Sequence, residues 1–136
     1  MDETHCHSPI TDPETLTSTD GESIDHSPNL CTSFDAMDLH TDILRGIYSF
    51  GFEVPSIIQQ QAILPISQSH DVIAQAQSGT GKTGSFVIGM LQRMVSSPPP
   101  EAEMAKLPRA LIMAPTREIA LQTGKVTEGI AKYLQL

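Results

Sequence analysis

The sequence contains no tryptophan, only two cysteines and no long apolar run. Because no Cys-x-x-Cys pair occurs, neither a disulfide scaffold nor a cysteine-based zinc site is expected, and a reducing intracellular compartment fits. No apolar stretch reaches the roughly 20 residues that cross a bilayer. The N-terminus is acidic and polar, unlike a secretory signal or an arginine-rich transit peptide. From these absences we expect neither a disulfide-rich secreted protein nor a membrane-spanning helix.

Basic side chains are absent from the first quarter of the chain. Residues 1–33 hold seven acidic residues but no Lys or Arg, whereas residues 34–136 hold eight basic and nine acidic residues. The first segment is rich in Ser, Thr and Pro, and it cannot bury enough apolar surface to offset the loss of chain entropy. We therefore expect residues 1–33 to be a disordered acidic tail. The nearly neutral remainder argues against a strongly basic, non-specific nucleic-acid binder.

The most informative stretch is Ala76-Gln77-Ser78-Gly79-Thr80-Gly81-Lys82-Thr83. It follows an apolar run at 71–74, which predicts a buried strand, and it precedes residues 84–95, which predict a helix. Strand, glycine-bearing loop, Gly-Lys-Thr and helix together are the context of a phosphate-binding loop. The alternative is a flexible Gly/Ser/Thr turn with a chance lysine, which the spacing and the flanking elements disfavour.

Each part of this loop suits a polyphosphate. Gly79 and Gly81 can adopt positive φ and approach a phosphate closely, so that successive backbone N–H groups point at the anion. The helix that starts near Lys82 adds the positive end of its dipole. In such loops the lysine reaches the β- and γ-phosphates and the following hydroxyl, here Thr83, binds Mg²⁺.

The remaining pattern predicts an α/β domain. Apolar residues at helical spacing predict a helix over 38–50, capped by Asp38 or Thr41 and closed by Gly51. Pro55 opens a second helix, which is expected to end at Pro65. Prolines 98–100 stop the helix that follows the loop.

Beyond these prolines, residues 109–114 predict a second buried strand. A third major helix is expected from Pro115 onward. The apolar residues of that helix available for burial are Ile119, Ala120, Val126, Ile130 and Tyr133. A helix between two short apolar strands is a βαβ unit, so a parallel sheet is expected.

Two further motifs flank the loop. Upstream lies Gly51-Phe52-Glu53-Val54-Pro55-Ser56-Ile57-Ile58-Gln59, with Phe34 seventeen residues earlier, and downstream lies Pro115-Thr116-Arg117-Glu118-Ile119-Ala120. With these motifs in this order, the chain resembles the DEAD-box RNA helicases of superfamily 2. The three stretches are similar to that family's Q motif, motif I and motif Ia. The resemblance covers about 34–136, and the wording of the motifs is most similar to members that act in translation initiation.

The resemblance implies a RecA-like P-loop NTPase fold with ATP and Mg²⁺ as cofactors. The amide of Gln59 carries a donor and an acceptor that complement the N6/N7 edge of adenine, and the resemblance implies this role. Phe34 would stack on the base. The alternatives are a surface role for Gln59 within the polar run 59–61 and a hydrophobic anchor role for Phe34.

Pro115, Thr116 and Arg117 lie at a predicted helix N-terminus just beyond a strand, where open α/β sheets place ligands. A helix start, a hydroxyl and a guanidinium all favour a phosphate group. By resemblance this phosphate belongs to an RNA backbone, so binding should be sequence-tolerant and salt-sensitive. The alternative is that Arg117 pairs with Glu118 or another nearby carboxylate.

The sequence contains no Asp-Glu-Ala-Asp and no Ser-Ala-Thr. By resemblance, the carboxylates that serve catalysis are therefore expected outside this chain, and 34–136 is expected to be the N-terminal part of a longer helicase. That helicase would unwind short RNA duplexes in the cytoplasm, with the nucleus as the alternative, beside other initiation factors. A non-catalytic nucleotide-binding or regulatory fragment, or another adenine-nucleotide P-loop enzyme, remains an alternative.

Three departures from the family pattern carry structural expectations. Gly84-Ser85 is expected to soften the first turn of the helix after the loop, and Gly129 to weaken the last helix. His40 stands where a capping serine is common, which leaves that cap in question. With only two strands visible, the domain is expected to be marginally stable by itself.

Overall fold

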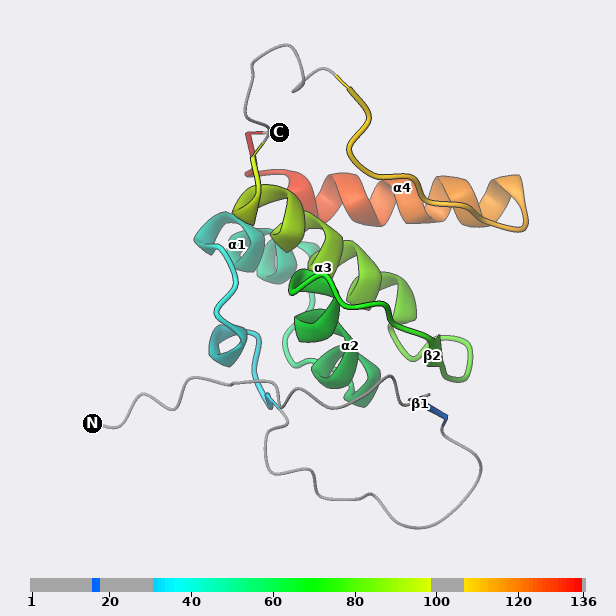
Figure 1. Cartoon of the computed structure of the whole chain (residues 1–136), viewed down its shortest axis with the longest axis horizontal. Coiled ribbons are helices and arrows are strands. Elements are labelled where there is room, and N and C mark those ends of the chain that lie inside the picture. Colours follow the sequence, from blue (N-terminus) through cyan, green and yellow to red (C-terminus); the bar gives the residue numbers. More distant parts are fainter. Residues whose placement is uncertain (1–15, 18–30, 99–106, 136) are drawn as a thin grey trace.

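The computed structural model describes residues 16–17, 31–98 and 107–135. Helix α3 lies at the centre, with α2 and α1 against it and α4 crossing both α1 and α3 (Figure 1). The elements in chain order are β1 (Leu16–Thr17), η1 (Asp35–Met37), α1 (Thr41–Phe50), α2 (Ile57–Ser67), β2 (Ala74–Gln75), α3 (Lys82–Ser96) and α4 (Arg117–Ala131). None of the helices in these described ranges is long and apolar enough to span a membrane.

Helix α1 begins with an unexpected cap. The imidazole Nδ1 of His40 accepts a hydrogen bond from the backbone N–H of Asp42 at 3.2 Å, so His40 serves as the N-cap in place of Asp38 or Thr41. A ring nitrogen with a lone pair satisfies an N-terminal donor as a hydroxyl does. Gly51 closes the helix at φ 99°, as the sequence predicts.

Helix α2 runs further than expected. Ser56 and Gln59 form a capping box at its start, and the helix continues through Pro65 to Ser67. The expected end at Pro65 is therefore wrong. A proline near the end of a helix removes one backbone hydrogen bond, and the last turn still closes because Gln68 N–H donates to the Leu64 carbonyl.

The sheet differs most from the prediction. Only Ala74 and Gln75 of the expected strand at 71–75 form a ladder, and their parallel partners are Leu16 and Thr17 rather than residues 109–114. Ile73, predicted to be buried, is 73% exposed. A parallel strand becomes buried only when neighbouring strands and helices cover it on both sides, and the described residues place no such cover here.

The second predicted strand is likewise wrong. Residues 107–114 have no strand partner among the described residues, and Leu111 is 84% exposed. The Nη2 atom of Arg109 donates to the carbonyls of Met94 (2.7 Å) and Ser97 (2.5 Å). These bonds tie the start of the segment to the C-terminal end of α3, where carbonyl groups lack helical partners.

The core lies between the helices instead of beneath a sheet. Its fully buried large side chains are Phe34, Met37, Ile43, Ile47, Ile63, Ile88, Leu91, Ile130, Val87 and Cys31. Order extends further toward the N-terminus than expected, since Cys31 is buried. Ile119 and Ala120, expected to be buried, are exposed.

Part of the predicted disordered tail at 1–33 is described by the structure. Leu16–Thr17 forms the short strand β1, which pairs with β2. Residues 1–15 and 18–30 lie outside the described residues, so the prediction for them is untested. The βαβ unit expected from 71–75, the following helix and 109–114 does not form. Ala74–Gln75 does form a parallel pair, but its partner is Leu16–Thr17.

Candidate phosphate-binding and RNA-facing site

The stretch from Ala76 to Thr83 forms a loop between β2 and α3. Gly79 and Gly81 adopt φ values of 81° and 95°, in the region that glycine reaches without strain. Gly81 is the N-cap of α3, no side chain caps that end, and the first turn contains no acidic residue. The first N–H groups of α3 therefore have no side-chain cap and no carboxylate from their own turn, which favours an anion.

Lys82 folds back across this loop. Its Nζ donates hydrogen bonds to the carbonyl of Ala76 and, at 2.6 Å, to that of Gln77. The Thr80 hydroxyl also donates to the Gln77 carbonyl at 2.9 Å. A phosphate would replace these carbonyls as the partner of the ammonium group, so anion binding requires the lysine to swing outward. Thr83 is half-buried one residue further into the helix.

The start of α2 is fastened to this loop. Gln59 is only 4% exposed, its Oε1 accepts from the Ser56 N–H at 2.8 Å, and its Nε2 donates to the Gly81 carbonyl at 3.3 Å. The Ser56 hydroxyl donates to the Thr80 carbonyl at 2.7 Å. Gln59 is thus neither on the surface nor turned toward solvent, and its amide holds the end of the loop.

Two glycines make this close contact between α2 and α3 possible. A Cβ atom on Gly81 or on Gly84 would lie 2.8 Å from the Gln59 Nε2, and at Gly84 it would also lie 3.2 Å from the Phe52 ring. A side chain at Gly84 would therefore need the Gln59 amide and the Phe52 ring to shift. Gly84 and Ser85 are both buried, and the softened first turn expected from them stays a prediction. Sequence reasoning missed Ser56, although its place three residues before Gln59 in a capping box was the available signal.

The predicted stacking role of Phe34 needs correction. Its ring is 0% exposed and lies edge-on to Tyr48, with ring centroids 6.3 Å apart. A ring enclosed by the core has no free face for a base, so the geometry agrees with the hydrophobic anchor alternative. The Tyr48 hydroxyl donates to the carboxylate of Asp35, which fixes the neighbouring turn.

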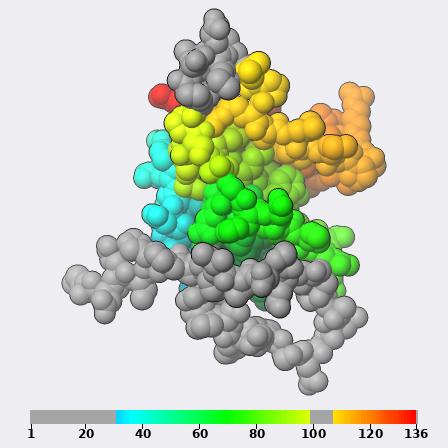
Figure 2. All heavy atoms as spheres, in the orientation of Figure 1, coloured from blue at the N-terminus to red at the C-terminus, as the bar shows by residue number. Residues whose placement is uncertain are grey.

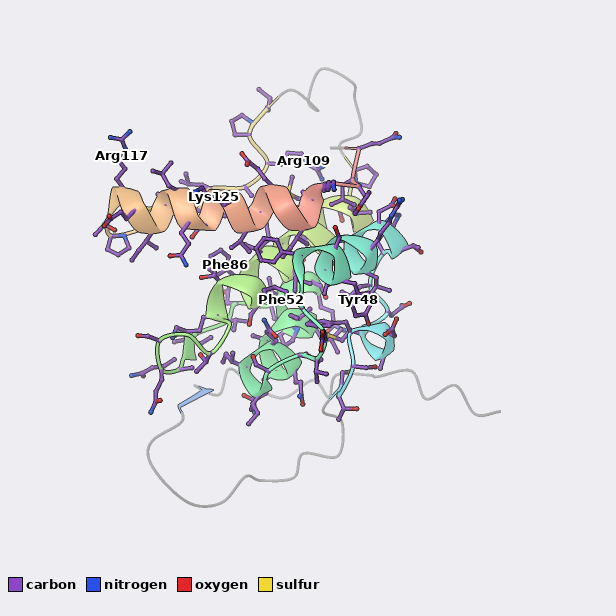
Figure 3. All side chains as sticks on the ribbon, turned by 180° about the vertical axis from the view of Figure 1, so that it is seen from behind. Tyr48, Phe52, Phe86, Arg109, Arg117 and Lys125 are labelled. Carbon is purple, nitrogen blue, oxygen red and sulfur yellow. The ribbon has the colours of Figure 1, made fainter. Side chains whose placement is uncertain are left out.

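Pro115, Thr116 and Arg117 lie at the start of α4, as predicted. The Thr116 hydroxyl accepts from the Ile119 N–H at 3.3 Å and caps the helix. Arg117 is exposed at the end of α4 and points away from the molecule (Figure 3). Within 31–98 and 107–135 it forms no ion pair, so the alternative that it pairs with Glu118 finds no support.

The phosphate loop and the start of α4 come from segments more than thirty residues apart. In Figure 1 both lie toward the same end of the molecule, where β2 leads into the loop and the orange end of α4 projects. Figure 2 shows the segment before α4 and the start of α4 at the surface. Among the described residues no cluster of three His, Cys, Asp or Glu side chains forms a metal site.

Comparison with known proteins defines the class. Residues 56–136 match the profile of the DEAD/DEAH box helicase family, which is more than half of the chain. The chain therefore belongs to the DEAD/DEAH box helicases.

Curated relatives sharpen this assignment. The ATP-dependent RNA helicase eIF4A of Saccharomyces cerevisiae is 52% identical over 103 residues, which cover 76% of this chain and 24% of that protein. The eIF4A of Mycosarcoma maydis is 47% identical over 117 residues, which cover 86% of this chain and 27% of the relative. The chain thus spans about a quarter of the length of these relatives.

Solved structures agree on the fold. Prp28 of Chaetomium thermophilum bound to ADP superposes with a TM-score of 0.70 at 31% identity, covering 80% of this chain and 26% of that one. Dbp5 of Saccharomyces cerevisiae bound to RNA and ADP BeF3 superposes with a TM-score of 0.63 at 40% identity. The match covers 77% of this chain and 26% of the Dbp5 chain. The predicted class, a partial RecA-like α/β fold, is therefore confirmed, although the sheet is minimal within the described residues.

Proposed function

We propose that this chain is the nucleotide-binding front of an ATP-dependent RNA helicase of the eIF4A type. The observation that carries the proposal is the uncapped N-terminus of α3 behind Gly81, with Lys82 at its first position and Gln59 holding the loop. This arrangement suits the β- and γ-phosphates of a nucleoside triphosphate. The intact protein would unwind short RNA duplexes in translation initiation.

Adenine and Mg²⁺ complete the nucleotide site in this proposal. Gln59 reads the adenine edge once its amide turns from the Gly81 carbonyl toward the base, and the Thr83 hydroxyl binds Mg²⁺ together with the phosphates. Phe34 is left out of the site because its ring is enclosed. Among the loop residues, Ala76, Gln77, Ser78, Gly79 and Thr80 supply backbone N–H groups to the phosphates.

The RNA backbone is the proposed partner of Pro115, Thr116 and Arg117. The guanidinium of Arg117 is exposed beside a helix N-terminus and forms no ion pair with the described residues, which supports a phosphate contact. Such a contact carries no base information. The proposed location is the cytoplasm, with other initiation factors as partners, by analogy with relatives named eIF4A.

The test is RNA-stimulated ATP hydrolysis by the full-length protein that contains this chain. We expect hydrolysis that rises with added single-stranded RNA, is abolished by Lys82→Ala, and is supported by ATP in preference to GTP. A rate of ATP hydrolysis that does not change when RNA is added would refute the helicase assignment. GTP outcompeting ATP would instead favour a different P-loop enzyme.

A second proposal concerns the 136-residue chain itself. It contains no Asp-Glu-Ala-Asp, the family segment that supplies the catalytic carboxylates, so residues 1–136 would bind nucleotide without hydrolysing it. A filter-binding assay with labelled ATP and a phosphate-release assay on the same sample separate the two activities. Release of phosphate above the rate of the Lys82→Ala variant would contradict this role.

A further inference from the structure

Helices α1 and α4 meet at two glycines, Gly46 on α1 and Gly129 on α4. A Cβ atom on Gly46 would lie 1.9 Å from the carbonyl oxygen of Ile130, and one on Gly129 would lie 2.4 Å from Cδ2 of the Phe50 ring. Both distances are far inside van der Waals contact, which for carbon atoms begins near about 3.5 Å. At both positions an added side chain would collide with the other helix.

The two glycines are not equivalent. At Gly129 the obstacle is the ring of Phe50, which is 40% exposed and can turn aside. At Gly46 the obstacle is helix backbone, with the Ile130 carbonyl carbon and Cα also within 3.1 Å of the added atom. Relief at Gly46 therefore requires α4 itself to move, so Gly46 sets the separation of the two helices.

Helix α4 packs on α1 and α3 through its C-terminal half, where Val126 and Ala131 also lie against the core. Its buried residues are Thr123 and Ile130, while residues 115–122 are all exposed. Beyond its C-terminal end, the Arg45 guanidinium lies 4.0 Å from the ring centroid of Tyr133, and the Tyr133 hydroxyl donates to Ser49 Oγ at 3.3 Å. Among the described residues the start of α4 is exposed. Its position therefore follows from the contact of its C-terminal half with α1 and α3, which we call the seat of α4.

A small shift of α4 where it contacts α1 displaces Arg117 at the other end of the helix. At 1.5 Å of rise per residue, Ile130 and Arg117 lie about 10 Å on either side of Thr123. A tilt about Thr123 that moves Ile130 by about 1 Å moves Arg117 by about the same amount in the opposite direction. Directed ionic hydrogen bonds tolerate roughly half that error.

We infer that Gly46 is a positioning residue for the proposed RNA contact, because its close approach to the Ile130 carbonyl seats α4 and thereby places Arg117. This inference rests on the proposed function, in which Arg117 binds an RNA phosphate. It adds a residue on a different helix, remote from the RNA, that sets how well this contact forms.

The experiment is a double-mutant cycle in the 136-residue chain. Gly46→Ala, Arg117→Ala and the double variant are titrated with fluorescent oligouridylate at several salt concentrations, and with a fluorescent ADP analogue. Gly124→Ala is the matched control, because a Cβ there meets nothing within 4 Å. It adds the same methyl group to α4 and raises helix propensity without disturbing the crossing.

We expect each single variant to weaken RNA binding roughly fivefold and to lower the salt slope by about one. The double variant should be no weaker than the singles, since both remove the same contact. Affinity for the ADP analogue should stay unchanged in all variants, because the phosphate loop is fastened to α2 by Ser56 and Gln59. Gly124→Ala should bind RNA as the parent does.

Additive losses, or equal losses of RNA and nucleotide affinity, would overturn the inference, because they would show general destabilisation. Unchanged RNA binding by Gly46→Ala beside a weakened Arg117→Ala would also overturn it and leave the proposed RNA contact standing. If Arg117→Ala has no effect, the RNA contact itself fails. If Gly46→Ala does not fold, Tyr133→Leu, which loosens the same seat by removing the Arg45 and Ser49 contacts, decides by the same criteria.

Discussion

The two helix N-termini that this proposal assigns to phosphate groups are built differently. Helix α3 starts behind Gly81 with no side-chain cap and no acidic residue in its first turn. Helix α4 starts behind Thr116, whose hydroxyl already satisfies the Ile119 N–H, and Glu118 lies in its first turn. The backbone N–H donors at the start of α3 have no side-chain acceptor, so an anion can accept from them. At the start of α4, one such donor is already satisfied by Thr116.

The start of α3 is also held more firmly by neighbouring elements than the start of α4. The loop before α3 is bound to α2 through Ser56 and Gln59, and Gly84 lets the helices approach. The start of α4 is exposed, and no side chain of another described element is hydrogen-bonded to it. The comparison suggests that α3 supplies a preorganised backbone site, whereas α4 contributes mainly one side chain, Arg117. Substitutions at the two ends should therefore differ in size and in kind.

The largest effect is expected at Lys82. Replacing it with alanine removes the only cation of the loop, so the affinity for ATP–Mg²⁺ should fall by roughly a hundredfold. The measurement is titration with a fluorescent ATP analogue. Lys125→Ala, an exposed lysine on α4, is the control and should bind normally. An affinity within twofold of the parent would show that the loop binds no triphosphate.

Gln59 should rank second. Gln59→Ala breaks the bond to the Gly81 carbonyl and the capping box at once, so ATP affinity should fall about tenfold and the free energy of unfolding by about 1–2 kcal/mol. Equilibrium urea unfolding and nucleotide titration measure the two effects separately.

Ser56→Ala provides the comparison for Gln59. It removes the bond to the Thr80 carbonyl but leaves the Gln59 amide in place. If Gln59 reads adenine, only Gln59→Ala should reduce the preference for ATP over GTP. Equal loss of that preference in both variants would show that Gln59 acts only by bracing the loop.

Arg117 should show a smaller and more selective effect. Arg117→Ala should weaken binding of single-stranded RNA roughly fivefold, with the same factor for every RNA sequence, because one exposed phosphate contact is lost. Fluorescence anisotropy with two RNAs of different composition measures this. A loss confined to one RNA would contradict a backbone contact, and a loss of nucleotide affinity would place Arg117 in the other site.

The smallest effect is expected at the cap of α4. Thr116→Ala should lower the free energy of unfolding by about 1 kcal/mol, since the Ile119 N–H loses its acceptor. Thr116→Ser keeps the hydroxyl and should be nearly neutral. Thermal unfolding followed by circular dichroism compares them. If alanine and serine behave alike, Thr116 is not a working cap, and the contrast between the two helix ends weakens.

Sequence reasoning located the helices well and the sheet poorly. The glycine spacing from Gly79 to Gly81, followed by Lys82, predicted both the positive φ values and the start of α3. The stop after Ser96 and the start of α4 at Arg117 also agree with the prediction. These features are encoded locally, by proline, glycine and capping residues within a few positions.

The errors share a different origin. Residues 109–114 have the composition of a buried strand, yet a strand also needs a partner, and no partner is encoded within the segment. Phe34 has the right spacing for a stacking aromatic, but spacing does not show whether a ring faces a ligand or the core. His40 was doubted as a cap, although an imidazole nitrogen can accept the same hydrogen bond.

The sequence by itself therefore determined the phosphate loop, its helix, the start of α4 and the family, because each depends on residues close together along the chain. Only the tertiary structure decided that Gln59 fastens the loop, that Phe34 is core, and that Gly46 meets the backbone of Ile130. Such contacts join residues that lie far apart in the chain, and their geometry is fixed by packing. No local pattern of residues contains that information.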